Sequence, residues 1–147
     1  MVAAVRGIRG AGLLTGLISN SWSTSHYDRK LLAELFDTAV ISAEVGLHKP
    51  QPQIYRLAAD RLHMEPGECI FVDDLRENCE GAAALGMTAV RHRNAAETIA
   101  KLAELTGLGL TAPPSGRGDK RSPSTTARGS APDARVRRSE ARRNPSN

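Results

Sequence analysis

Aromatic residues and cysteines are scarce in this chain. Phe, Trp and Tyr together make up 3% of the 147 residues, and there are two cysteines, Cys69 and Cys79. Two cysteines provide neither a disulfide framework nor a cysteine-rich metal cluster, so we expect reduced thiols packed as small apolar groups. No apolar run approaches the roughly 20 residues that span a bilayer. These absences exclude a disulfide-stabilised or membrane-spanning protein and favour a cytoplasmic one.

Positive charge is concentrated in the last quarter of the chain. Residues 111–147 carry nine Lys and Arg against three Asp and Glu, whereas residues 1–110 carry eleven against thirteen. The basic segment is rich in Pro, Ser, Gly and Arg and has almost no large apolar side chains, which predicts a disordered tail. Such a tail could bind nucleic acid or another polyanion weakly, but a solvated extension without a partner explains the same composition more simply.

The first 110 residues alternate between strand-like and helix-like patterns. Short apolar runs predict strands, and amphipathic stretches predict helices between them. The expected strands are 13–19, 38–42, 69–73 and 88–92, and the expected helices are 25–37, 52–63, 76–86 and 95–107. Strands separated by helices imply parallel crossovers. The fold class is therefore α/β, a three-layer Rossmann-like parallel sheet covered by helices on both faces.

Polar side chains gather where three of these strands end. Ser19 and Asn20 follow the first strand, and Lys49 lies in the loop after the second. Asp73 and Asp74 end the third. Sites in open parallel sheets lie beyond the carboxyl ends of the strands, so these groups are expected to share one crevice. A hydroxyl, an ammonium and paired carboxylates suit phosphoryl chemistry with a bound metal, although the acids alone would also fit the first turn of a helix.

The motifs that carry these residues resemble those of the haloacid dehalogenase superfamily of hydrolases. "LLTGLISNSW" is similar to its second motif, "GLHKPQPQIY" to its third and "CIFVDDLRENCEGAAALGMTAVRH" to its fourth, in the order that the family has them. A phospho-receiver domain also combines acids, a hydroxyl and a lysine, but its acids come first along the chain, which argues against it. The resemblance covers residues 1 to about 107.

The resemblance implies that the second and third motifs bind the substrate. Ser19 would hold phosphate through its hydroxyl, and Lys49 would stabilise the negative charge on it. Asn20 would donate to substrate oxygens, although a turn-forming role also suits an Asn at this position.

The resemblance also implies a magnesium site in the fourth motif. Asp74 would be a ligand of Mg²⁺, supported by Asp73, with Asn78 behind the two acids. The paired acids favour a magnesium-dependent phosphatase over a true dehalogenase. The subgroup that the chain resembles is the phosphatase-type domain found beside epoxide hydrolases, which implies a small phosphorylated metabolite as substrate.

The family's first motif, a strand that ends in Asp-x-Asp, is not found in this sequence. The resemblance places the nucleophilic Asp and the general acid/base there, and puts this strand at the centre of the sheet, between the strands that end in Ser19 and Asp74. The cap that selects the substrate is not found either. We therefore expect residues 1–110 to be a partial hydrolase core, followed by the disordered tail over 111–147.

A missing central strand leaves unpaired inner edges in the sheet, and three outcomes follow. The favoured one is a truncated gene product without activity of its own. The alternatives are a second chain or copy that supplies the strand, and direct pairing of the Ser19 and Asp74 strands in a four-stranded domain.

The leading function is accordingly a magnesium-dependent phosphatase that acts through an aspartyl-phosphate. The alternative is a non-catalytic phosphate- or metal-binding domain whose basic tail binds a polyanion.

Overall fold

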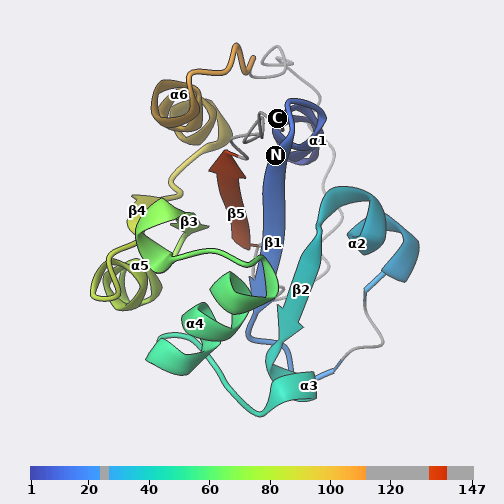
Figure 1. Cartoon of the computed structure of the whole chain (residues 1–147), viewed down its shortest axis with the longest axis vertical. Helices are drawn as coiled ribbons and strands as arrows, with labels where there is room; N and C mark the ends of the chain where they lie inside the picture. The colour runs from blue at the N-terminus through green and yellow to red at the C-terminus, as the bar shows by residue number, and fades with distance from the viewer. Residues whose placement is uncertain (24–26, 112–132, 139–147) are drawn as a thin grey trace, which may run out of the picture.

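A five-stranded sheet forms the centre of the computed structural model, which describes residues 1–23 and 27–111 and the backbone of 133–138. The strand order is β2-β1-β5-β3-β4 (Figure 1). The strands are Leu13–Ser19 (β1), Thr38–Ile41 (β2), Ile70–Asp73 (β3), Thr88–Arg91 (β4) and Asp133–Arg138 (β5). As predicted, β1 pairs with β2 and β3 pairs with β4 in parallel.

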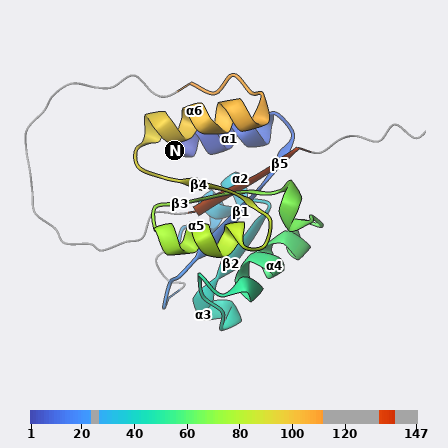
Figure 2. The same ribbon diagram turned by 90° about the vertical axis from the view of Figure 1, so that its left-hand side faces the viewer.

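Helices cover both faces of this sheet and make three layers (Figure 2). The helices are Val2–Gly10 (α1), Arg29–Leu35 (α2), Ser42–Val45 (α3), Pro52–Arg61 (α4), Arg76–Ala83 (α5), Ala95–Thr106 (α6) and the short 3-10 helix Pro66–Glu68 (η1). α1 and α6 lie over one face, and α4 and α5 lie over the other. The α/β class and the three-layer arrangement expected from the alternating pattern are confirmed. Within the described residues, none of the helices has the length and apolar character needed to cross a bilayer.

Local sequence signals set the ends of several helices. α2 lies within the expected helix 25–37, of which residues 25 and 26 fall outside the described ranges, and it begins after Asp28, whose carboxylate accepts hydrogen bonds from the first backbone N–H groups and so caps it. Pro52 begins α4, where the N–H that proline lacks would have no helical partner. Gly107, in the left-handed region at φ 70°, ends α6.

The side chains of β1 alternate between two hydrophobic clusters. Ile18 packs with Phe71 in the cluster beneath α4, whereas Leu17 packs with Leu35 in a cluster beneath α1 and α2. Residues two apart in a strand share a face, so Ser19 lies on the same face as Leu17. The last residue of β1 is therefore directed toward the α2 side of the sheet.

β5 occupies the position between β1 and β3 and runs antiparallel to both (Figure 1). Six residue pairs join it to β1, from Leu13–Arg138 to Ile18–Asp133, and two join it to β3. Residues 133–138 belong to the segment whose composition predicts disorder, and they form a strand instead. The reason is that two inner strand edges carry N–H and C=O groups that an extended segment can pair. Residues 112–132 and 139–147 lie outside the described part of the chain.

Direct pairing of β1 with β3, one of the three expected outcomes, does not occur in this structure. β5 separates the two strands and pairs with each of them, which gives five strands rather than four. A segment of the same chain thus fills the position between β1 and β3.

Removing β5 is expected to destabilise the sheet. A chain that ends at residue 132 loses the strand that pairs with both β1 and β3, and each backbone hydrogen bond contributes about 1 kcal/mol net. We expect the free energy of unfolding, measured by urea denaturation, to fall by more than about 2 kcal/mol. Light scattering should show self-association as the exposed edges pair between molecules. A chain that ends at residue 138 keeps β5 and is the matched control, and equal stability of the two shortened chains would contradict the pairing of β5.

Candidate functional site

The Lys49 ammonium lies at the carboxyl ends of β1 and β3 and connects them. It donates a hydrogen bond to the Asp73 carboxylate at 2.8 Å and another to the Ile18 carbonyl oxygen at 3.2 Å. The Lys49 and Asp73 side chains are 5% and 1% exposed, so the ion pair is buried. Lys49 also lies over the Phe71 ring, 5.8 Å from its centroid. The expected convergence of the lysine and the acids at one sheet edge is what the structure has.

Protein donors occupy both oxygens of the Asp73 carboxylate. Oδ2 accepts from Lys49 and, at 2.9 Å, from the Asn78 side-chain amide. Oδ1 accepts from the backbone N–H of Leu75 at 2.7 Å. Buried charges are tolerated when their hydrogen-bonding positions are filled in this way. Asp73 is therefore built as an anchor for Lys49 and for the start of α5, and Asn78 is one of its donors.

Asp74 differs from its neighbour because its side chain is exposed. Its carboxylate accepts no hydrogen bond from the part of the chain that the structure describes, although its backbone carbonyl accepts one from Arg91 at 3.3 Å. Its charge is nevertheless close enough to Lys49 to act on that ammonium. Of the two acids, Asp74 is the one with oxygens available for a ligand from solution.

Burial dominates the electrostatics of the site. Desolvation lowers the pKa of Lys49, and the hydrogen bond and negative charge of Asp73 oppose that shift only in part. Desolvation also raises the pKa of Tyr55, whose hydroxyl donates to the Asn78 carbonyl at 2.9 Å, and so keeps it a neutral donor. Burial raises the pKa of the Cys79 thiol for the same reason, which makes a reactive thiolate unfavourable there.

Asn20 joins the loop that carries Lys49 to the end of β1. Its side-chain amide donates to the Lys49 carbonyl at 3.0 Å, and its side-chain oxygen accepts from the Lys49 backbone N–H at 2.8 Å. Both polar atoms of Asn20 are thus engaged with the backbone of the lysine loop. The structure gives Asn20 the role of holding Lys49 in place, whereas donation to a substrate stays a prediction.

Ser19 is buried at the end of β1, and its hydroxyl oxygen lies 2.5 Å from the hydroxyl oxygen of Tyr27. Ser19 is therefore at the expected edge of the sheet, with a partner that the sequence did not reveal. Tyr27 lies eight residues along the chain in the segment before α2, and no pattern in the sequence relates it to Ser19.

Gly81 of α5 allows the lysine loop to approach that helix closely. A Cβ atom at this position would lie 2.9 Å from both the Cβ and the carbonyl oxygen of Pro50, and 3.1 Å from the Tyr55 hydroxyl. Separations below 3.0 Å are not tolerated, so the close packing of Pro50, the residue after Lys49, requires glycine here. The glycine of the fourth motif thus helps to place the lysine of the third.

Taken together, the structure links Lys49, Asp73, Asn78 and Asn20 by hydrogen bonds and leaves Asp74 exposed beside them. Within the described ranges there is no group of three or more His, Cys, Asp or Glu side chains that could hold a metal. A metal at this edge would consequently need oxygens from water or from a bound anion besides Asp74.

Comparison with known proteins points in the same direction as the motifs. The family model "haloacid dehalogenase-like hydrolase" matches residues 1–86. The bifunctional epoxide hydrolase 2 of Rattus norvegicus is 32% identical over 114 residues, which cover 73% of this chain and 21% of that protein. The chain spans about a fifth of the length of the first curated relatives that it matches.

Solved structures share the fold. An uncharacterized protein from Corynebacterium glutamicum is similar with a TM-score of 0.67 and 25% identity, over 71% of this chain and 79% of that one. A HAD phosphatase from Thermococcus onnurineus is similar with a TM-score of 0.57 and 29% identity, over 71% of this chain and 55% of that one.

Breaking the buried ion pair from one side should be more harmful than removing both charges. Lys49→Met leaves the Asp73 carboxylate buried without its cation, and we expect a loss of about 3–5 kcal/mol in the free energy of unfolding. In the double variant Lys49→Met/Asp73→Asn no net charge remains buried, so we expect a smaller loss than in the single variant. Urea denaturation measures both. Lys101→Ala, which breaks an exposed ion pair with Glu104, is the control and should change stability by less than about 1 kcal/mol.

Gly81→Ala should be destabilising although alanine is the better helix former. The added Cβ pushes Pro50 and the Lys49 loop away from α5, and overpacking of this kind costs roughly 1–3 kcal/mol. Gly10→Ala, at a helical position where nothing lies within 4 Å of the added Cβ, is the matched control and should be neutral or stabilising. Thermal unfolding followed by circular dichroism compares the two variants. Similar unfolding temperatures would show that Pro50 does not need this space.

Proposed function

The chain belongs to the haloacid dehalogenase-like hydrolase family, and we propose that its core supplies the phosphate- and magnesium-binding part of a phosphatase that acts on a small phosphomonoester. The observation that carries this proposal is the buried Lys49–Asp73 pair with the exposed Asp74 carboxylate beside it. Lys49 provides a positive charge held in place, and Asp74 provides exposed carboxylate oxygens near it. A phosphate group between an ammonium and a carboxylate-bound cation would have its charge neutralised from both sides.

The residues present fit a magnesium ion that binds together with phosphate. Mg²⁺ prefers oxygen ligands, keeps several waters and is commonly held by one or two carboxylates plus substrate phosphates. Asp74 offers such a carboxylate, whereas both oxygens of Asp73 already accept hydrogen bonds from the protein. When bound, the ion would stabilise negative charge on phosphoryl oxygens.

Three residues of this chain have separate tasks in the proposed reaction. The Ser19 hydroxyl donates to a phosphate oxygen, Lys49 offsets the phosphate charge, and Asp74 holds the cation. The family resemblance implies an Asp nucleophile and an aspartyl-phosphate, and the 147-residue sequence contains no Asp-x-Asp segment to provide it. A second candidate function is a domain that binds phosphate and Mg²⁺ without turnover, with weak polyanion binding by the basic segment.

Phosphate binding in the presence of Mg²⁺ tests the proposal. Isothermal titration calorimetry with inorganic phosphate should show an affinity that rises at least tenfold when Mg²⁺ is added, on the order expected for a metal that bridges carboxylate and phosphate. Asp74→Asn should remove this gain while the protein stays folded. Glu77→Gln, which removes an exposed acid three residues further along, is the matched control and should keep it. Phosphate binding that is unaffected by Mg²⁺ and by Asp74→Asn would refute the proposed site.

Turnover separates the two candidate functions. Magnesium-dependent hydrolysis of p-nitrophenyl phosphate by the chain, abolished by Asp74→Asn, would establish a phosphatase complete in itself. Phosphate binding without hydrolysis would favour the binding domain or a nucleophile supplied from outside these 147 residues.

A further inference from the structure

The only described hydrogen-bond partner of the Ser19 hydroxyl is the Tyr27 hydroxyl, at 2.5 Å. Ser19 is 7% exposed, so within the described residues its oxygen depends on this one contact to satisfy its hydrogen bonding. Either oxygen can be the donor in this pair, because each hydroxyl has one proton and can also accept. Which of the two donates decides whether Ser19 can donate to anything else.

The Tyr27 ring is held so that its hydroxyl stays near Ser19. The ring packs against the cluster beneath α1 and α2, which includes Leu17 and Leu35. Asp28, the next residue, caps α2, and the other end of that helix is tied to β1 by a hydrogen bond from the Thr15 hydroxyl to the Leu35 carbonyl at 2.6 Å. The Leu35 end of α2 is thus fixed relative to β1, and Tyr27 directly precedes the capped start of the same helix.

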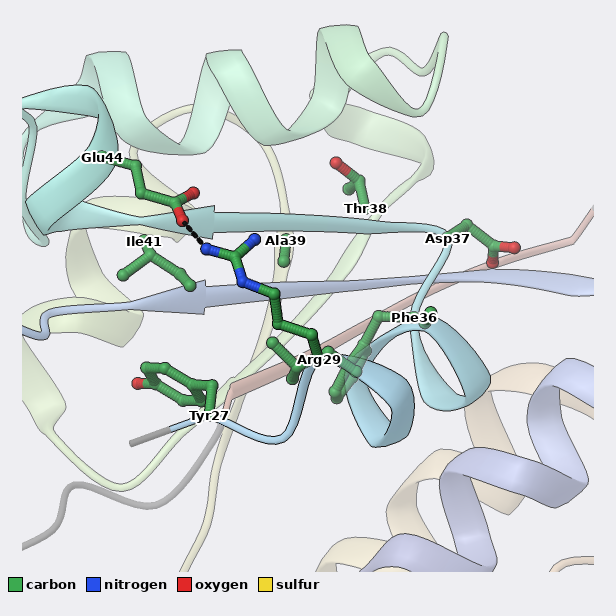
Figure 3. A pocket seen from close by; sticks show the side chains of 10 residues that line it. Tyr27, Arg29, Phe36, Asp37, Thr38, Ala39, Ile41 and Glu44 are labelled. Atoms are coloured by element: carbon green, nitrogen blue, oxygen red, sulfur yellow. Dashed lines mark hydrogen bonds and ion pairs between the residues drawn. The ribbon is translucent and has the colours of Figure 1, made fainter. Parts of the chain in front are cut away.

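Figure 3 shows the direction of the Tyr27 side chain. The ring lines a pocket of about 290 Å³ between α2 and β2, and its hydroxyl points in the direction in which β1 and β2 run, toward their carboxyl ends. That edge carries Ser19 and Lys49. The apolar ring therefore faces the cluster while the polar tip reaches the site.

We propose that Tyr27 is a positioning residue for phosphate binding, which donates its hydroxyl proton to Ser19 and so leaves the Ser19 proton directed at a phosphate oxygen. The inference rests on the proposed phosphate-binding role of Ser19. If Ser19 donated to Tyr27 instead, it would have no proton left for phosphate. A chain of donors from Tyr27 through Ser19 to the anion also polarises each bond in the same sense, which strengthens the last one.

The test compares inorganic phosphate binding, at saturating Mg²⁺, by four full-length proteins in isothermal titration calorimetry. These are the wild type, Tyr27→Phe, Ser19→Ala and the double variant. Tyr27→Phe keeps the packed ring and removes only the hydroxyl, so we expect phosphate affinity to fall roughly three- to tenfold. Ser19→Ala should reduce it by at least as much. In the Ser19→Ala background, Tyr27→Phe should change affinity less than about twofold, because the residue through which it acts is gone.

If Tyr27 acted only through packing, Tyr27→Phe, which keeps the ring, would leave phosphate affinity unchanged. The proposal predicts a different pair of results. Tyr27→Leu, which loses the ring as well, should lower the unfolding temperature, whereas Tyr27→Phe should lower phosphate affinity with little change in that temperature. Ser19→Cys, of similar size and with a weaker hydrogen-bonding group, replaces Ser19→Ala if the alanine variant does not fold.

The results distinguish failure of the role of Tyr27 from failure of the proposed function. Wild-type affinity in Tyr27→Phe, with weak binding in Ser19→Ala, overturns the role of Tyr27 and leaves the proposed function intact. An equal loss from Tyr27→Phe in both backgrounds also overturns it, because Tyr27 would then act independently of Ser19. If the wild type does not bind phosphate with Mg²⁺, the proposed function fails and the role of Tyr27 fails with it.

Discussion

The buried ion pair between Lys49 and Asp73 is the interaction on which the rest of the site depends. Two charges out of contact with water are tolerated only when their remaining hydrogen-bonding positions are filled. The Ile18 carbonyl accepts from Lys49, and the Asn78 amide and a backbone N–H donate to Asp73. These partners come from β1, from the start of α5 and from the turn after β3. The pair therefore fixes several elements at once, and the closely packed helix α5 holds the lysine loop from the other side.

The same ion pair connects two strands that are separated by β5. With β5 between them, the ends of β1 and β3 are two strand spacings apart, about 10 Å. The long Lys49 side chain meets both ends, because its ammonium bonds Ile18 on β1 and Asp73 on β3. Direct pairing of β1 with β3 would halve this separation and bring the two partners of the ammonium onto neighbouring strands. In this structure the Lys49 ammonium thus bridges two strands that are not direct neighbours in the sheet.

Local patterns account for what the sequence could predict. The expected strand 13–19 agrees with β1, and the other three strands of residues 1–110 agree within one residue, because short apolar runs carry the strand signal directly. The meeting of Lys49 with Asp73 followed from the rule that parallel strands end at one edge. The pairing of β5 and the contact of Tyr27 with Ser19 depend on surfaces that exist only after folding, and no local pattern marks them. The hydrogen bonds between Asn20 and the Lys49 backbone could not be predicted for the same reason, since the two residues lie 29 positions apart.

The side chains of the two adjacent acids lie in different environments because β3 ends between them. Successive residues of a strand point to opposite faces, so Asp73 shares the face of Phe71 and meets Lys49, while Asp74 lies just beyond β3 and is exposed. The charge of Asp73 is balanced inside the protein, whereas Asp74 has no ion-pair partner among the described residues. The Asp73 carboxylate would reduce, without removing, the repulsion between the Lys49 ammonium and a cation on Asp74. Under the proposed function, an anion beside both positive groups would reduce the remaining repulsion, so phosphate and Mg²⁺ would stabilise one another here.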